Sequence, residues 1–220
     1  MLYLKSKPDN MKRFYILLIC IFSISVATAQ DMATFFIDIP DQYLPQLEDA
    51  WRKDLIDLYK SGNPAVLDNT MGGRSTLQKL TADYLLLQVT ERSTMEIKFL
   101  PLINNTLIAC VITTVFAPIA DSRVTFFSMD WQPLPAVEIW SPATSDSFLK
   151  DDIDREDENF REAISYLDMD LIHYHLDPEQ LIIKAEYTTP DYLSLEERTK
   201  ITPFLQDSPK IYYWKTGRFE

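Results

Sequence analysis

Glycine, cysteine and positive charge are all scarce in this chain. Only 4 of its 220 residues are glycine and 2 are cysteine, and 21 Lys and Arg residues stand against 33 Asp and Glu, for a net charge of −12. Loops that cradle phosphate need glycine so that the backbone can approach the ligand, and this scarcity argues against such a site. An acidic surface repels nucleic acid and anionic lipid, so we expect neither as a partner.

The N-terminal stretch has the layout of a secretory signal. A basic start at residues 11–13 is followed by an apolar run over 14–26 and by small residues at 27–29. This order is typical of a cleaved signal peptide, which we expect to span residues 1–29, with 1–10 arising from an over-early start codon. The apolar run is too short to span a bilayer comfortably, although a retained anchor is the alternative. We expect a periplasmic or secreted protein with no stable membrane insertion after cleavage.

The two cysteines cannot form a disulfide once the signal is removed. Cys20 lies inside the apolar run, and Ile19 precedes it where a lipoprotein signal needs a small residue, so we expect no lipidation. Cys110 then remains alone, between Ala109 and Val111 in an apolar run. We expect it to be a buried, inert thiol rather than a nucleophile.

Four apolar runs between residues 83 and 131 organise the chain. They are rich in β-branched and aromatic residues and are separated by short polar breaks, which is typical of an antiparallel meander. The run over 107–116 has little polar alternation and should be covered on both faces. Glu96 and Lys98 should give their own strand one solvent-exposed face. The expected strands cover residues 84–89, 94–99, 107–116 and 122–129.

The rest of the pattern predicts helices and further strands. Apolar residues at spacings of three and four predict an amphipathic helix over 41–61, which would cover one face of the sheet. Other expected elements are a short strand or extended lead-in over 32–39, short strands over 76–80 and 137–140, helices over 156–167 and from 195, a hairpin over 171–176 and 181–187, and a last strand over 210–214. With 46% hydrophobic residues, the sequence predicts an α+β fold, with antiparallel β-meander sheets packed with a few helices.

The two halves of the chain have related patterns. Each has an amphipathic helix, then a hairpin that opens on an aspartate, Asp83 or Asp170, and later an aromatic strand that follows a serine. We therefore expect two tandem helix-plus-sheet halves, residues 30–135 and 136–220, packed as one globular unit. A continuous sheet across the halves and a true duplication are both open.

One loop holds half of the glycines. Residues 68–75 read Asp-Asn-Thr-Met-Gly-Gly-Arg-Ser, so the backbone there needs unusual angles. The pair of glycines before Arg and Ser can hold an anion, but the Lys-Ser/Thr ending of a P-loop is missing, and a structural turn is the alternative. Because loops on a rigid sheet often carry sites, we predict a binding surface here and at the end of the meander. Its residues are Asp68, Asn69, Gly72, Gly73, Arg74, Ser75, Asp130 and Trp131.

The only two histidines lie two residues apart on one expected strand. His173 and His175 should therefore point the same way. Neutral imidazoles can converge on zinc, and a third ligand would have to come from Asp, Glu or Tyr on a neighbouring strand. The alternative is a pair of half-exposed histidines without a ligand.

An acidic run over residues 151–158 has enough carboxylates for calcium. An EF-hand loop needs a central glycine, which this run lacks. Acidic residues also favour the first turn of a helix, which is the interpretation we prefer.

Several short motifs resemble those of a known family. They are Asp68-Asn69, Gly72-Gly73, Ser75-Thr76-Leu77, Asp83-Tyr84, Leu100-Pro101-Leu102-Ile103-Asn104, Asp121-Ser122 and Asp130-Trp131-Gln132-Pro133-Leu134. Through them the chain resembles a family of small secreted Bacteroidales proteins that is catalogued only as a domain of unknown function, number 3256. The resemblance implies an exported protein and brings no catalytic residues.

These features favour a non-catalytic binding module of the periplasm or cell surface, with a protein or small ligand as partner and no cofactor. Two alternatives stay open, namely a metal-dependent or hydrolytic enzyme that uses His173 and His175, and a structural envelope component. An exposed, aromatic-lined sheet face would favour binding. A closed pocket where both histidines meet a carboxylate would favour the enzyme.

Overall fold

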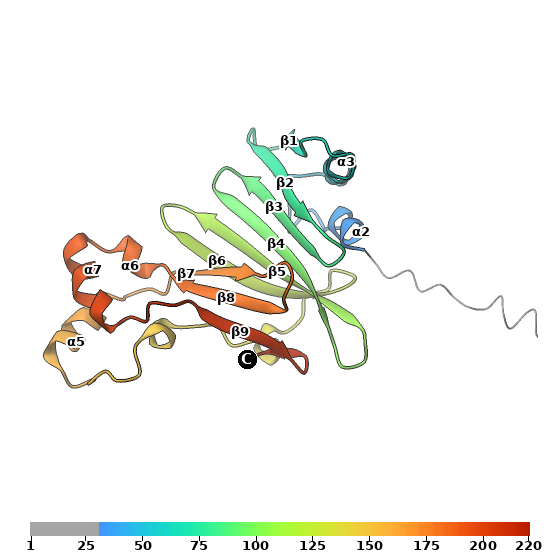
Figure 1. Cartoon of the computed structure of the whole chain (residues 1–220). Helices are drawn as coiled ribbons and strands as arrows, with labels where there is room; N and C mark the ends of the chain where they lie inside the picture. Colours follow the sequence, from blue (N-terminus) through green and yellow to red (C-terminus); the bar gives the residue numbers. More distant parts are fainter. Residues whose placement is uncertain (1–30) are drawn as a thin grey trace, which may run out of the picture. The chain divides into compact units, whose positions relative to one another are not determined.

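Two separate antiparallel sheets organise the protein. In the computed structural model, which describes residues 31–220, a six-stranded sheet has the order β1-β2-β3-β4-β5-β6 and a four-stranded sheet has the order β10-β9-β8-β7 (Figure 1). The α+β class and the antiparallel meander are therefore confirmed, whereas a continuous sheet is wrong. The expected signal peptide over residues 1–29, and Cys20 within it, lie outside the described residues.

The six-stranded sheet is a meander in chain order, as its run of short polar breaks predicts. The strands are β1 (Val66–Asp68), β2 (Arg74–Leu80), β3 (Tyr84–Thr90), β4 (Ser93–Pro101), β5 (Leu107–Phe116) and β6 (Ala120–Ser128). β5 pairs with β4 and β6 along its length, and its central residues from Ile108 to Ile112 are buried, which confirms a strand covered on both faces. The short β1 was not expected from the sequence.

The second sheet contains the expected hairpin and last strand. Its members are β7 (Ile172–Leu176), β8 (Ile182–Tyr187), β9 (Lys210–Lys215) and β10 (Arg218–Phe219). Ile172, Tyr174 and Leu176 of β7 join a hydrophobic core with Tyr84 and Cys110 of the first sheet. The two sheets are thus held together by a common core.

The other face of the first sheet is covered by α2 (Met32–Ile37) and α3 (Asp49–Lys60). The extended lead-in expected over 32–39 is wrong, because Asp31 caps a helix by accepting a hydrogen bond from the Thr34 amide at 2.7 Å. The helix expected over 41–61 begins only at Asp49, since Pro45 inside that range is incompatible with a helix interior.

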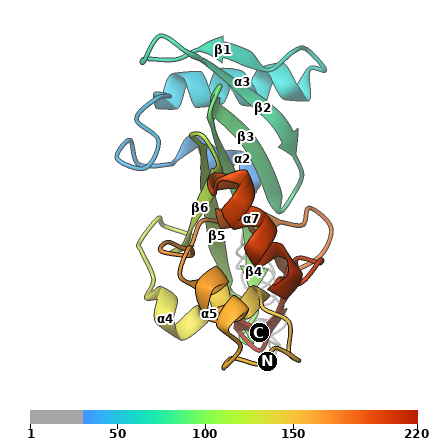
Figure 2. The same cartoon turned by 90° about the vertical axis from the view of Figure 1, so that its left-hand side faces the viewer.

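The remaining helices lie beside the second sheet. They are α4 (Ala136–Ile139), the 3₁₀ turn η1 (Ser145–Phe148), α5 (Glu158–Ile164), α6 (Thr189–Tyr192), α7 (Leu195–Ile201) and the 3₁₀ turn η2 (Thr202–Phe204). α4 replaces the strand expected over 137–140, because the chain turns for a single helical turn after Pro135. α7 carries the capping box that its sequence predicts. α5 and α7 lie beside each other, away from α3 (Figures 1 and 2).

None of the helices in residues 31–220 is long and apolar enough to cross a membrane.

Candidate functional site

β7 presents its backbone edge to the first sheet, in addition to the side chains that join the common core. The amide of Tyr174 donates to Oγ of Ser122 at 3.1 Å, and the amide of Leu176 donates to Oε2 of Glu96 at 3.1 Å. The amide of Ile172 lies 3.4 Å from Oδ1 of Asp121. Backbone amides on a buried edge need partners, and here side chains of the first sheet supply them. A corner forms where the two sheets meet.

Glu96 is the buried anchor of this corner. Its side chain accepts hydrogen bonds from the Tyr84 hydroxyl at 2.9 Å and from the Leu176 amide, and lies 3.3 Å from Nδ1 of His175. Burial, followed by the charge of Glu96, raises the pKa of Tyr84, which keeps the phenol protonated as a donor. The exposed face expected for Glu96 and Lys98 is therefore wrong, because both residues are buried beneath the second sheet.

Lys98 links the first sheet to the turn between β7 and β8. Its ammonium contacts Oδ2 of Asp83 at 2.8 Å and the carbonyl oxygen of Pro178, in the β7–β8 turn, at 2.8 Å. Buried charges need such partners, and Glu96 and Lys98 each have several. Glu96 and Lys98, which alternate with apolar residues along β4, thus form hydrogen bonds that join the two sheets.

The two histidines lie on the face of β7 opposite its core side chains. Nε2 of His175 is 3.1 Å from Nδ1 of His173, and the ring of Phe116 contacts His173 edge-on with centroids 5.5 Å apart. Glu96 accepts a hydrogen bond from Nδ1 of His175, which leaves Nε2 of that ring to contact His173.

The environments of the two imidazoles move their pKa values in opposite directions. Burial, followed by the neighbouring His175, lowers the pKa of His173 to about 4. The hydrogen bond to Glu96 raises the pKa of His175 against the opposing effect of burial. His173 is therefore neutral at pH 7.

Glu186 completes a group of three potential metal ligands. It lies on β8 directly opposite His173, and its carboxylate and one nitrogen of each histidine all lie within 4.8 Å of one another. It comes from a neighbouring strand, as the sequence required of a third ligand. Within residues 31–220 no other group of His, Cys, Asp and Glu satisfies this geometry. Lys184, opposite His175 on β8, is paired with Asp177 at 3.3 Å.

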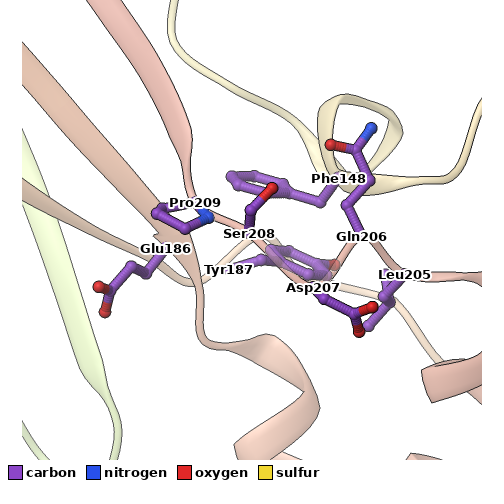
Figure 3. Close-up of a pocket in the computed structure, with 8 residues that line it drawn as sticks. All are labelled: Phe148, Glu186, Tyr187, Leu205, Gln206, Asp207, Ser208 and Pro209. Atoms are coloured by element: carbon purple, nitrogen blue, oxygen red, sulfur yellow. The ribbon is translucent and has the colours of Figure 1, made fainter.

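A hollow of about 270 Å³ lies at the end of β8, lined by Glu186 and Tyr187 and by residues 205–209. Phe148 and Tyr187 stack in it with ring centroids 5.0 Å apart. Glu186 borders the hollow but points its carboxylate away from the stacked rings (Figure 3). The histidine corner and the hollow are therefore distinct surfaces.

Most polar groups of the glycine loop, residues 68–75, form hydrogen bonds within the loop or to the neighbouring strand β3. Oδ1 of Asn69 accepts from the amides of Met71 and Gly73 at 3.0 and 3.1 Å, and its Nδ2 donates to the carbonyl of Val89 at 3.2 Å. Ser75 is buried and also donates to Val89, at 2.7 Å. Gly72 has a φ of +76°, so the unusual backbone angle expected for the pair falls on Gly72. Asp68 and Arg74 are exposed.

Trp131 belongs to the core beneath α2, while its neighbour Asp130 is exposed. The indole stacks on Phe35 with centroids 4.2 Å apart, and its Nε1 donates to the Phe35 carbonyl at 3.0 Å. No hydrogen bond within residues 31–220 joins Asp130 or Trp131 to the glycine loop. The eight residues of that predicted surface are thus divided between core, turn and solvent.

Cys110 and the acidic run behave as structural elements in the described chain. Cys110 is fully buried, as expected, and burial raises the pKa of its thiol. Asp157 caps α5 by accepting from the Asn159 amide at 2.6 Å, and Arg155 pairs with Asp146 at 3.2 Å. The helix start preferred for the acidic run is confirmed.

The fold and the corner define an α+β protein of two antiparallel sheets with a histidine–carboxylate cluster where they meet. The chain belongs to the family described as protein of unknown function (DUF3256), whose model matches residues 24–219. A domain of an uncharacterized protein from Porphyromonas gingivalis W83 has a similar structure, with a TM-score of 0.77 and 26% identity, covering 84% of this chain and 96% of that one. No curated protein matches the chain. The family resemblance of the motifs is confirmed.

Proposed function

We propose that this protein is an exported binding protein of the periplasm or cell surface, and that its ligand site is the corner between the sheets. The observation that carries the proposal is the bonding capacity left over at the corner. Glu96 is fully engaged in holding the fold and His175, but Nδ1 of His173 and Nε2 of His175 contact only each other. The exposed carboxylate of Glu186 has no hydrogen bond to any group within residues 31–220. A binding site for a small ligand needs polar groups of this kind, whose positions are fixed by residues behind them, as Glu96 fixes His175.

Two features favour binding over catalysis. Glu96, the most obvious general base, accepts three hydrogen bonds that hold the sheets and the histidine in place. The corner is also open, since the side chain of His175 is 39% exposed. Both histidines do meet a carboxylate, as an enzyme would require, but with this exposure of His175 the residues described by the structure leave the corner open to water.

Export is supported by the order of basic, apolar and small residues over 11–29. N-terminal sequencing of the protein from its own envelope fraction should begin at Gln30 or within a residue or two. A full-length chain in the cytoplasm would contradict export while leaving the ligand site untested by that result.

Ligand binding is tested on the protein isolated from the envelope without chelator. Native mass spectrometry should show an adduct on the wild type that is lost in the double variant His173→Gln, His175→Gln. Glu179→Gln is the matched control, because Glu179 is an exposed carboxylate in the adjacent β7–β8 turn. The same spectrum for all three proteins, with or without adduct, would contradict a ligand site at the corner.

A second candidate is metal-dependent hydrolysis at the same corner. Two histidines and a glutamate also form the ligand set of hydrolytic zinc sites, which keep a fourth position open for water. Release of product from ester, peptide or phosphoester substrates by zinc-loaded wild type, and not by Glu186→Gln, would favour this candidate over binding alone.

A further inference from the structure

We infer that the ligand of the corner is a single divalent transition-metal ion of the zinc type, bound by Nδ1 of His173, Nε2 of His175 and a carboxylate oxygen of Glu186. The inference rests on the proposed function, for which it names the ligand. Three independent features of the corner support it.

The first feature is the spacing of the ligand atoms. Two nitrogens bound to a tetrahedral zinc ion lie about 3.3 Å apart, given Zn–N distances of about 2.0–2.1 Å. Nδ1 of His173 and Nε2 of His175 are 3.1 Å apart. The ring centroids are 3.7 Å apart and the ring planes are inclined by 54°, so the imidazoles must turn for both lone pairs to point at one ion. A Glu186 carboxylate oxygen lies within 4.8 Å of one nitrogen of each histidine, and a rotation of this exposed side chain closes the remaining gap. The backbone positions of all three ligands are fixed by pairing between β7 and β8.

The second feature is the buried carboxylate behind His175. A histidine that binds a metal through one nitrogen usually donates its other N–H to a carboxylate, which fixes the ring and its tautomer. Glu96 accepts from Nδ1 of His175 at 3.3 Å and is itself held by Tyr84 and Leu176. Nε2 of His175 is thereby the nitrogen of this ring that is left to bind a metal.

The proton of His173 has a defined destination when the metal binds. Coordination through Nδ1 places the proton of neutral His173 on Nε2 of the same ring. Coordination through Nε2 of His175 leaves the proton of that ring on Nδ1, beside Glu96, and any proton on Nε2 passes to solvent as the metal binds. The charge of Glu186 offsets half that of the ion.

The third feature is the chemistry of the ligand set. Imidazole nitrogens suit zinc, nickel and copper, whereas calcium and magnesium take oxygen ligands. Here two of three ligands are nitrogens. Three protein ligands leave one tetrahedral position, which a water molecule or a group from a partner can fill.

The experiment uses the mature protein from the envelope fraction, stripped with a chelator and titrated with CoCl₂ and then ZnSO₄. We expect one Co²⁺ per chain with the intense visible bands of a tetrahedral site, displaced by one equivalent of Zn²⁺. Loss of a residue that only hydrogen-bonds to a metal ligand already costs about 10–100-fold in metal affinity. Loss of a direct ligand, in His173→Gln or Glu186→Gln, should therefore weaken Zn²⁺ binding by more than about tenfold. Glu179→Gln should bind as wild type does. Glu186 is exposed, so its variant is expected to fold normally.

Equal affinity for wild type and Glu186→Gln, or the absence of tetrahedral Co²⁺ bands, would overturn the metal assignment. An envelope protein that carries a non-metal adduct, lost when both histidines are replaced, would also overturn it while leaving the binding proposal intact. Absence of both the adduct and metal binding would overturn both. The two failures are therefore distinguishable.

Discussion

The glycine loop over residues 68–75 and the histidine corner are both polar clusters carried by a sheet, but they use their polar groups differently. In the loop, the side-chain amide of Asn69 forms its hydrogen bonds with the backbone of Met71, Gly73 and Val89. In the corner, Glu96 is engaged in the same way, yet His173, His175 and Glu186 keep potential ligand atoms that are not bonded to the surrounding fold. A polar cluster is a site only where bonding capacity remains after the fold has been satisfied.

The largest effect should come from Asn69→Ala in the loop. Removing the amide leaves buried backbone groups without partners, which should lower the free energy of unfolding by about 3 kcal/mol. Urea unfolding measures this loss, and Zn²⁺ affinity of the folded variant should stay that of wild type. Asp68→Ala, at an exposed neighbour, is the control. If Asn69→Ala were as stable as its control, the loop would not be a structural device and the comparison would break.

Glu96→Gln should affect both stability and binding, because Glu96 holds the sheets together and also orients His175. Hydrogen bonds to a charged group are worth about 1.5–3 kcal/mol, so we expect a loss near 2 kcal/mol in urea unfolding. Zn²⁺ affinity should fall by about 10–100-fold, as for other outer partners of a metal ligand. Calorimetric titration of the folded variant checks the second effect. Unchanged affinity would mean that Glu96 is structural only.

The two adjacent glycines should differ. Gly72 has a φ of +76°, where a side chain is strained, so Gly72→Ala should cost about 1 kcal/mol. Gly73 has an ordinary φ, and a Cβ there would meet Nδ2 of Asn69 at 3.4 Å, which is close to an ordinary contact. Gly73→Ala should remain within about 0.5 kcal/mol of wild type. Thermal unfolding of both variants measures the two stability losses. A larger loss for Gly73→Ala than for Gly72→Ala would contradict the assignment of the positive φ to Gly72.

The smallest effect should come from Arg74→Ala. Arg74 is exposed and forms no ion pair within residues 31–220, so the change should alter stability by less than about 0.5 kcal/mol. Pull-down from envelope extract and Zn²⁺ titration should also match wild type. A partner that wild type captures and Arg74→Ala does not would restore the loop as a binding surface.

Sequence patterns predicted the elements whose signal is local. The meander, the 171–187 hairpin and the capping box at Ser194 all follow from alternation, turn residues and caps within a few positions. Residues 32–37 were not recognised as a helix because two short turns leave too little periodicity to tell it from a strand. The helix start at Asp49 was recoverable from Pro45, which the apolar spacing of Leu44 and Leu47 obscured.

The candidate site was only half predictable, for a similar reason. The spacing of His173 and His175 put them on one face, but the expected hairpin with a turn over 177–180 would have placed Lys184 opposite His173. The structure places Glu186 there, because Leu176 pairs with Ile183. Glu96 gave no such signal, since its alternation with Met95 and Ile97 is the ordinary mark of a solvent-facing strand. Its burial depends on the second sheet, which is 80 residues away along the chain at Leu176. Only tertiary packing reveals such a contact.

The capped edge of β7 bears on how the protein avoids self-association. An exposed strand edge is a template on which another chain can add a strand, and natural sheets shorten or block such edges. Here β1 has three residues and β10 has two, while the longer β7 has its outward amides taken by Asp121, Ser122 and Glu96. If the second sheet separates from the first, the backbone amides of β7 lose these partners and can pair with a strand of another chain. Aggregation should therefore begin at this strand, before the meander itself unfolds.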